Sequence, residues 1–551
     1  MRTGPFTTSK SLMVVALGVV FAGATTAQQE TPPAPAAPRS VTIPKPVEQT
    51  LKNGLRVIVI EDNDIPLVSA GVVIKNGGEV DPADLSGLAE LTASLMPKGT
   101  KTRTAPQIAQ DIEALGGTIQ TGAGWDASRA LIGVMSSKFD PALTILADVV
   151  RNPVFKEDEI ERLRQQYLDD LSVTLGQPGS VAGLVASRVV FGDAAYGHPL
   201  AGTPESLTRI KQADIVAFHS KYYRPDNAVL VIGGSIKAAD AFKLAERLFG
   251  DWEKPITPIP PRGQVGKMAR ADEKQRVVVV DMPDAGQAAV VLARLGISRT
   301  DPDYFRGIVT NSVLSGYSGR LNQEIRIKRG LSYGARSSLD VRRESGPFVA
   351  SAQTKNPSGA EVATLLIGEL GRLSTEAVAD AELTPRKAVL IGGFGRGLET
   401  TDGLVGQVAS LALYGLSLDE INNYIRNVQS VTAADVQKFA GSRLTAKDAN
   451  IIIVGNAKDF LEPLRKQFTN VEVIPLADLD LNSAALKKAG KFRVRSSEFG
   501  VRRFGTVSGS KFRVSSFEFG RRRGKPYESV VAIFLASDDY CHSCDRFRAV
   551  E

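Results

Sequence analysis

An internal repeat of about 220 residues constrains the fold of this 551-residue chain more than any other feature. Residues 448–456, Asp-Ala-Asn-Ile-Ile-Ile-Val-Gly-Asn, echo residues 226–234, Asp-Asn-Ala-Val-Leu-Val-Ile-Gly-Gly. The other matching segments are the predicted strands 55–60 and 68–74 with 277–281 and 288–295, and the predicted helices 86–96 with 305–314. Because strands alternate with helices and hairpins, we expect an α+β fold. We predict two homologous domains, each a mainly antiparallel sheet packed with helices.

The beginning of the chain has the features of a cleavable signal peptide. A positively charged start precedes an apolar stretch over 12–22, and small residues at 22–27 are typical of a cleavage site. The apolar stretch is short for a bilayer, so a retained anchor is the less favoured alternative and no stable membrane span is expected. The sequence therefore predicts a periplasmic or secreted protein.

Composition also predicts where the domains end. Four Pro within residues 253–265 mark a linker between the two copies of the repeat. The predicted segments are a signal peptide (1–27), a Pro- and Ala-rich leader (28–47), an N-terminal domain (48–252), a linker (253–270), a C-terminal domain (271–478) and a basic, low-complexity tail (479–551).

The positive charge of the chain is concentrated in its tail. The whole chain has a net charge of +7, but residues 481–551 alone hold 15 Lys or Arg and 7 Asp or Glu. The remainder is therefore nearly neutral, and we expect no nucleic-acid partner. A strip of basic and aromatic residues that binds RNA or an anionic membrane is the less favoured interpretation of the near-duplicates at 491–494 and 511–514.

Both cysteines of the chain, Cys541 and Cys544, lie in this tail. An exported body without cysteines has no disulfide framework and depends on its own cores. A single Cys-x-x-Cys is weak evidence for a metal or redox site, and a local or an intermolecular disulfide remains open.

Residues 86–100 contain the first candidate site. Leucines recur there at helical spacing, and Ser86 is the predicted N-cap. Glu90, Ala93 and Ser94 fall at positions i, i+3 and i+4, so they share a helical face. On such a face, a zinc peptidase helix carries His-x-x-Glu-His, in which two imidazoles bind the metal and the Glu acts as general base.

This stretch resembles the signature of the insulinase/pitrilysin-like zinc peptidases, which reads roughly Gly-Leu-Ala-His-x-x-Glu-His-Met-x-x-x-Gly-Thr. The matching residues are Gly87, Leu88, Ala89, Lys98, Gly99 and Thr100. Glu90, Ala93 and Ser94 stand where the family has its two ligands and its base. The resemblance also places Asp170 at the position of a third ligand, although a solvated helix charge is the preferred interpretation. We therefore expect no metal site in this chain.

The run 314–336 contains the second candidate site. In the resembling family, the C-terminal domain offers an Arg and a Tyr, seven residues apart, to a peptide bound at another domain's zinc. Arg326 and Tyr333 match this pair and its spacing. A guanidinium and a phenol can stabilise the oxyanion that develops on a peptide carbonyl. Gly316 and Gly319 are expected to let a backbone approach closely.

The sequence therefore predicts a non-catalytic, substrate-binding subunit of a heteromeric zinc metallopeptidase. The chain has three histidines, His198, His219 and His542, and none is paired at helical spacing. The resemblance implies a partner subunit that carries the zinc motif, with zinc as the partner's cofactor and a peptide as the substrate. Two alternatives remain open: a structural scaffold, and a stand-alone peptide-binding protein without a role in hydrolysis.

Overall fold

The computed structural model describes residues 43–260, 275–488, 512–518 and 531–537. The predicted signal peptide, most of the leader, the second half of the linker and both cysteines lie outside these residues. Among the described residues, no helix combines the length and the apolar character needed to cross a bilayer.

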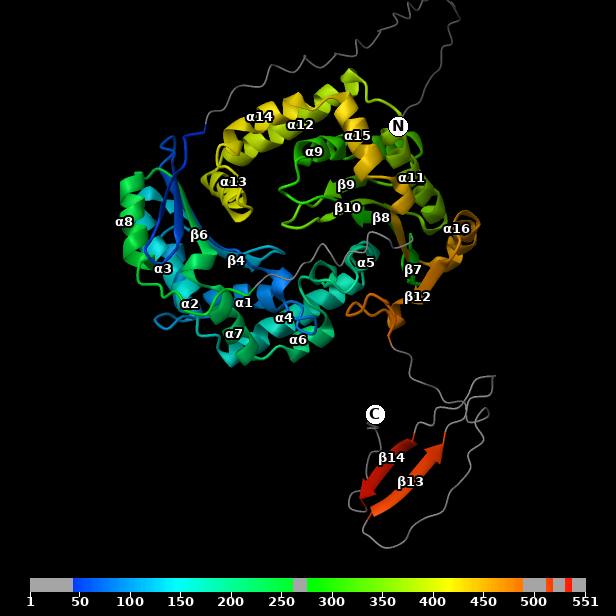
Figure 1. Ribbon diagram of the computed structural model, residues 1–551, viewed down its shortest axis with the longest axis horizontal. Helices are drawn as coiled ribbons and strands as arrows, with labels where there is room; N and C mark the ends of the chain where they lie inside the picture. Colours follow the sequence, from blue (N-terminus) through cyan, green and yellow to red (C-terminus); the bar gives the residue numbers. More distant parts are fainter. Residues whose placement is uncertain (1–42, 261–274, 489–511, 519–530, 538–551) are drawn as a thin grey trace, which may run out of the picture. The chain divides into compact units, whose positions relative to one another are not determined.

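The first half of the chain, coloured from blue to green in Figure 1, forms a six-stranded sheet with the order β1-β2-β6-β3-β5-β4. Its strands are β1 (Val47–Thr50), β2 (Arg56–Glu61), β3 (Leu67–Ile74), β4 (Thr118–Ala123), β5 (Ser128–Met135) and β6 (Ala228–Gly234). Within this sheet, β2 and β6 are parallel neighbours. All the other neighbours in this sheet are antiparallel.

The second half forms another six-stranded sheet with the order β12-β7-β11-β8-β10-β9. Its strands are β7 (Val277–Asp281), β8 (Ala288–Leu295), β9 (Ala335–Leu339), β10 (Pro347–Thr354), β11 (Asn450–Gly455) and β12 (Val471–Pro475). Here β7 is parallel to β11 and β12, and the other neighbours are antiparallel. The order β7-β11-β8-β10-β9 repeats β2-β6-β3-β5-β4 with the same strand directions. The prediction of two related domains with mainly antiparallel sheets is confirmed.

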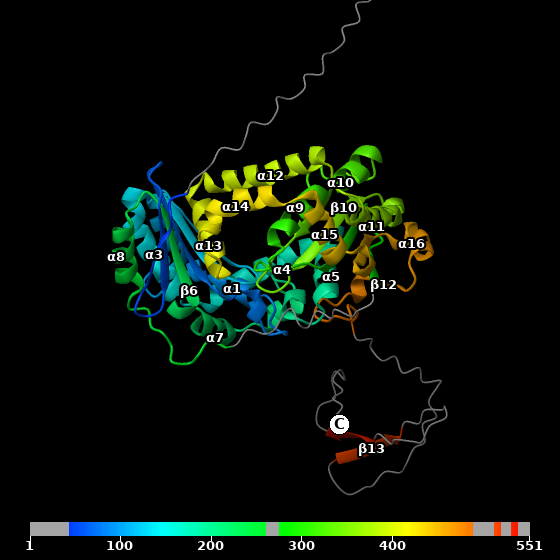
Figure 2. The same cartoon turned by 45° about the horizontal axis from the view of Figure 1, so that its top comes forward.

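Helices surround both sheets (Figure 2). In the first half they are α1 (Leu88–Leu95), α2 (Ala105–Ala114), α3 (Phe139–Arg151), α4 (Glu157–Leu175), α5 (Pro178–Phe191), α6 (Pro204–Arg209), α7 (Gln212–Tyr222) and α8 (Ala238–Phe249). In the second half they are α9 (Tyr304–Leu314), α10 (Arg320–Asn322), a π-helical turn (Gln323–Lys328), α11 (Gly359–Thr375), α12 (Asp380–Leu398), α13 (Thr401–Leu413), α14 (Glu420–Ser430), α15 (Ala433–Arg443) and α16 (Leu461–Gln467).

Each sheet is apolar on both faces because its central strands are continuous runs of aliphatic residues. In β2, Val57 and Val59 point to one core while Ile58 and Ile60 point to another. This is the two-residue period of a strand. A sheet of this kind must be covered on both sides by helices.

The two halves exchange one covering helix each. Helix α13, from the second half, packs through Leu404 and Val405 on the face of the first sheet that contains Ile58 and Ile60. Gly233 in β6 permits this approach, because a Cβ at that position would lie 2.9 Å from Val405 Cγ2. Helix α5, from the first half, packs in the same way on the second sheet (Figure 1; Figure 2). The two halves therefore share two of their apolar cores.

The packed body extends beyond the predicted boundary at residue 478. Leu481 and Leu486 are buried in the core under α5, and the guanidinium of Arg188 donates two hydrogen bonds to the Leu481 carbonyl oxygen. Within the predicted low-complexity tail, β13 (Phe512–Glu518) and β14 (Val531–Ser537) form an antiparallel pair. The predicted low-complexity tail therefore contains a two-stranded sheet.

Candidate functional site

Helix α1 begins differently from the sequence prediction. Gly87, not Ser86, is the N-cap, with a φ of 94° that favours glycine. The buried carboxylate of Asp81 accepts hydrogen bonds from the backbone N–H groups of Gly87 and Ala89, both at 2.9 Å. Ser86 instead bonds to Ser206. The Ser86 prediction is wrong because an upstream loop supplies the acceptor.

The face of α1 that would carry zinc ligands is occupied by a closed hydrogen-bond cluster. Glu90 Oε1 lies 3.0 Å from Ser94 Oγ and 3.1 Å from the Tyr167 hydroxyl, and Glu90 Oε2 accepts the Ala123 N–H at 2.5 Å. The Tyr167 hydroxyl also lies 2.8 Å from Ser94 Oγ. Ala93 is fully buried in the core of the first half. The cluster therefore joins α1, α4 and the edge strand β4.

Tyr167, not Asp170, is the residue of α4 that contacts this cluster. Asp170 is exposed and lies with other charged side chains of α4. Burial and the nearby Glu90 charge raise the pKa of Tyr167, so its hydroxyl keeps its proton. The sequence analysis did not predict Tyr167 as a site residue. Its position one helical turn before Asp170 places it on the same side of α4 and could have indicated it.

The cluster does not have the chemistry of a zinc site. Zinc in proteins prefers imidazole and thiolate ligands with one or two carboxylates. Glu90, Ser94 and Tyr167 offer one carboxylate and two hydroxyl groups, and Ala93 has no group that could act as a base. In the described part of the chain, no three His, Cys, Asp or Glu side chains lie together as metal ligands would.

The second candidate site brings Arg326 and Tyr333 together. Arg326 lies on the π-helical turn after α10, and Tyr333 precedes β9 with 91% of its surface exposed. The Arg326 guanidinium carbon is 4.9 Å from the Tyr333 ring centre and 5.3 Å from that of Tyr317. Tyr333 is therefore not packed on the core. The two aromatic rings limit where the guanidinium can point.

The two predicted glycines serve the local chain path. Gly316 has a φ of 94°, which L side chains rarely adopt. A Cβ on Gly319 would overlap the carbonyl oxygens of Leu314 and Ser315. The loop that leads into α10 therefore accounts for both glycines, without a substrate backbone.

Arg326 and Tyr333 both line a cavity of about 1100 Å³. One wall is the start of α5, where Gly179 and Gly183 carry no side chain that would fill the space. The opposite wall is the sheet of β8, β10 and β9, and the loop before β9 completes the lining. The helix exchange thus builds this cavity, since one wall comes from each half of the chain.

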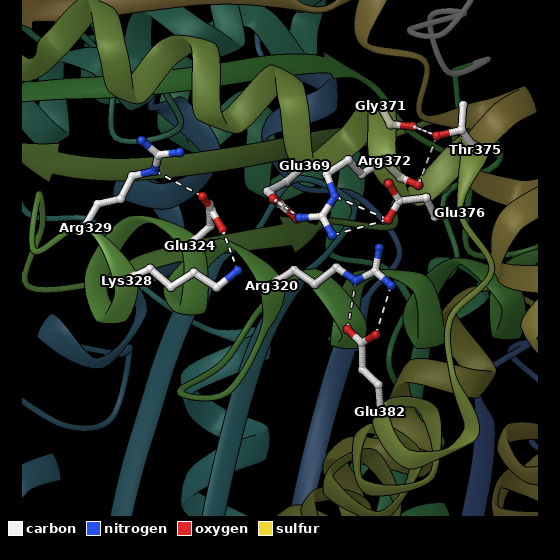
Figure 3. Close-up of polar contacts among 10 residues, drawn as sticks. All are labelled: Arg320, Glu324, Lys328, Arg329, Glu369, Gly371, Arg372, Thr375, Glu376 and Glu382. Atoms are coloured by element: carbon white, nitrogen blue, oxygen red, sulfur yellow. Dashed lines mark hydrogen bonds and ion pairs between the residues drawn. The ribbon is translucent and has the colours of Figure 1, made fainter.

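The charged neighbours of Arg326 are paired with one another (Figure 3). Glu324 lies 2.9 Å from Lys328 and 3.0 Å from Arg329, and these cations lower the pKa of Glu324. Arg320 binds both oxygens of Glu382, at 2.8 and 2.9 Å. Within the described residues, Arg326 itself has no carboxylate partner, and it lines the cavity.

Sequence reasoning also missed a buried contact between the halves, centred on Asp126. Its carboxylate accepts the backbone N–H of Arg343 at 2.7 Å and the Tyr414 hydroxyl at 3.0 Å, both from the second half, and a hydrogen bond from Tyr196. Arg343 also lies 3.5 Å from Glu79. Burial raises the pKa of Glu79 to about 7, against the opposing effects of the Gly77 N–H and Arg343. No local sequence signal marks these residues.

Two family models match the chain in order. The model described as "Insulinase (Peptidase family M16)" matches residues 56–203, and the one described as "Peptidase M16 inactive domain" matches residues 209–390. An uncharacterized zinc protease of Mycobacterium leprae is 26% identical over 400 residues, covering 72% of this chain and 89% of that protein. An uncharacterized zinc protease of Bacillus subtilis is 24% identical over 400 residues, covering 71% and 95%.

Solved structures agree with this assignment. A crystal structure of a peptidase M16 inactive domain from Pseudomonas fluorescens has a TM-score of 0.69 and 26% identity, covering 74% of this chain and 98% of that one. A protease from Helicobacter pylori has a TM-score of 0.70 at 22% identity and supports the fold alone. Since the two family models together span more than half of the sequence, this chain belongs to peptidase family M16, the insulinase family.

Proposed function

We propose that this chain is a non-catalytic, substrate-binding subunit of a heteromeric zinc metallopeptidase. One contrast carries the proposal: the zinc-motif face is closed by Glu90, Ser94 and Tyr167, while Arg326 and Tyr333 face an accessible cavity. A catalytic zinc needs about three protein ligands and an open position. The partner, a family member with an intact His-x-x-Glu-His, supplies the metal and the base.

Arg326 and Tyr333 act on the peptide that the partner holds. Both are hydrogen-bond donors at neutral pH, and the carbonyl oxygen of a peptide becomes negatively charged during hydrolysis. Donors that are already oriented toward that oxygen stabilise the charge more than mobile donors do. The aromatic contacts of Arg326 with Tyr333 and Tyr317 provide this orientation.

The test is peptidase activity of the mature chain, first alone and then mixed with the zinc-motif subunit. We expect activity only in the mixture, and about a 100-fold loss with Arg326→Ala or Tyr333→Phe, as for other oxyanion donors. Arg426→Gln is the matched control, because Arg426 is an exposed cation on α14. Zinc-dependent hydrolysis by the isolated chain would contradict the proposal.

The same mixture separates the proposal from its alternatives. A structural scaffold would leave the partner's activity unchanged when Arg326 or Tyr333 is replaced. A stand-alone peptide-binding protein would bind peptide but form no complex with the zinc-motif subunit in sedimentation experiments. We place the complex in the periplasm or outside the cell on the basis of residues 1–27, and N-terminal sequencing of the exported chain tests this placement.

A further inference from the structure

The cavity around Arg326 contains a second cation that no sequence motif indicated. Arg336 is an exposed residue of the edge strand β9, and it lines the same cavity. It lies directly opposite Ser351 of β10, on the face of the sheet that also contains Ser338 and Gln353. The side chains of this face are short or uncharged apart from Arg336, so its guanidinium is the dominant charge there.

The part of the chain that the structure describes gives the cavity cations but no acidic side chain. Arg326 and Arg336 both line it, and no Asp or Glu of those residues does. Neither arginine forms an ion pair within the described residues, whereas the nearby Arg320 and Arg329 both do. A recess that contains charges of a single sign concentrates ligands of the opposite sign.

We propose that Arg336 makes this cavity selective for a carboxylate of the bound peptide. A guanidinium presents two parallel N–H donors that match a carboxylate, and such charged pairs are stronger than neutral hydrogen bonds. Arg326 and Tyr333 hold the peptide carbonyl, and Arg336 binds an acidic group a short distance along the peptide. The inference rests on the proposed function for the identity of the ligand, a peptide, and adds its charge.

A charged residue on an edge strand has a simpler role, which is to prevent pairing between sheets of different molecules. That role makes no distinction between acidic and neutral peptides. It also does not require that the lining lack carboxylates. Selectivity between isosteric peptides therefore separates the two roles.

The experiment measures the binding of labelled peptides to the mature full chain by fluorescence anisotropy. Three Ala/Ser-based peptides are compared: one with a central Glu-Glu pair and an amidated C-terminus, the same peptide with Gln-Gln, and the Gln-Gln peptide with a free C-terminus. We expect one of the two carboxylate peptides to bind about tenfold more tightly than the neutral one, as a charge-assisted bond predicts. Which of the two does so identifies the carboxylate as a side chain or a C-terminus.

Arg336→Gln should reduce this ratio to about twofold or less, while Arg426→Gln should preserve it. Arg336→Lys retains the charge without the paired donors and should give an intermediate ratio. Equal binding of all three peptides, or an unchanged ratio in Arg336→Gln, would overturn the inference. Circular dichroism of each variant confirms that the exposed substitution leaves the fold intact.

The outcomes separate this inference from the proposed function. Charge-selective binding that depends on Arg336, together with an inactive mixture, contradicts the role in hydrolysis but keeps the selectivity. If the mixture is active and its activity depends on Arg326, but the Glu and Gln peptides are cleaved equally, the role in hydrolysis is kept and the selectivity is contradicted.

Discussion

Glu90 and Glu79 of the first half differ from Arg326 of the second half in how completely their side chains are paired. In the first half, Glu90 interacts with the Ser94 and Tyr167 hydroxyl groups and the Ala123 N–H, and Glu79 is buried among donors. In the second half, the Arg326 guanidinium lies against the rings of Tyr317 and Tyr333 and forms no ion pair with the described residues. A group whose hydrogen bonds are complete within the protein contributes to stability, whereas one that faces a cavity without a partner is available to a ligand. The face of α1 that contains Glu90 is thus closed by contacts within the protein, whereas Arg326 lines a cavity without an ion-pair partner among the described residues.

The largest change in stability is expected at Glu79, in the first half of the chain. Its pKa in the folded protein is about 7, above its ordinary value of 4.5, because it is buried. The folded protein therefore holds this proton more tightly than the unfolded chain does. Its contribution to the free energy of unfolding is complete below about pH 4.5 and is lost as the pH rises to about 7.

Glu79→Gln should remove this loss. As the pH rises from about 4.5 to above 7, the native chain should lose on the order of 3 kcal/mol of stability that the variant does not lose, the free energy that corresponds to the pKa difference. Urea unfolding of both proteins between about pH 4 and pH 8 measures this difference, because a buried carboxyl group titrates in that range. A variant whose stability follows the native pH profile would show that Glu79 is not held protonated.

Glu90→Ala tests whether the former metal position is structural. It leaves the Ala123 N–H and the Ser94 hydroxyl without their acceptor, and we expect a loss of about 2 kcal/mol in the free energy of unfolding. Ser94→Ala removes the Ser94 contacts with Glu90 and Tyr167 but leaves Glu90 as an acceptor for Tyr167 and Ala123, so it should cost about 1 kcal/mol or less. Unchanged stability in Glu90→Ala would mean that water replaces the carboxylate and that the cluster is not a brace. Peptide binding in the cavity should be unaffected by either change.

Arg326→Ala should give the smallest change in stability, within about 0.5 kcal/mol. Arg326 forms no ion pair with the described residues, so its removal leaves no buried charge unpaired. Thermal unfolding of the purified Arg326→Ala chain measures this change in stability, and Arg320→Ala is the comparison. Arg320 binds Glu382 through two hydrogen bonds and should cost measurably more. A large loss in Arg326→Ala would place Arg326 with the structural residues and weaken the comparison.

The strands and the zinc-motif helix could be predicted because their signals are local. The continuous aliphatic run of β2 and the leucine spacing of α1 depend only on neighbours in the sequence. The cap of α1 could not be predicted, since its acceptor is the side chain of Asp81, six residues before Gly87 and outside the usual N-cap position. The apolar stripe of a helix indicates that the helix packs on another element, but not on which sheet. The exchange of α5 and α13 could therefore not be predicted from the sequence. Arg336 was missed for a similar reason, because its position in a cavity depends on residues from both halves.

The exchanged helices also set an order for folding. All strands of the first sheet have been synthesised by residue 234, but the helix that covers one of its apolar faces, α13, is completed only at Leu413. Until then Ile58, Ile60 and Val231 have no cover on that side. Contacts that join such distant parts of a chain form late and leave intermediates prone to aggregation. The first half therefore cannot complete its packing until α13 of the second half has been made.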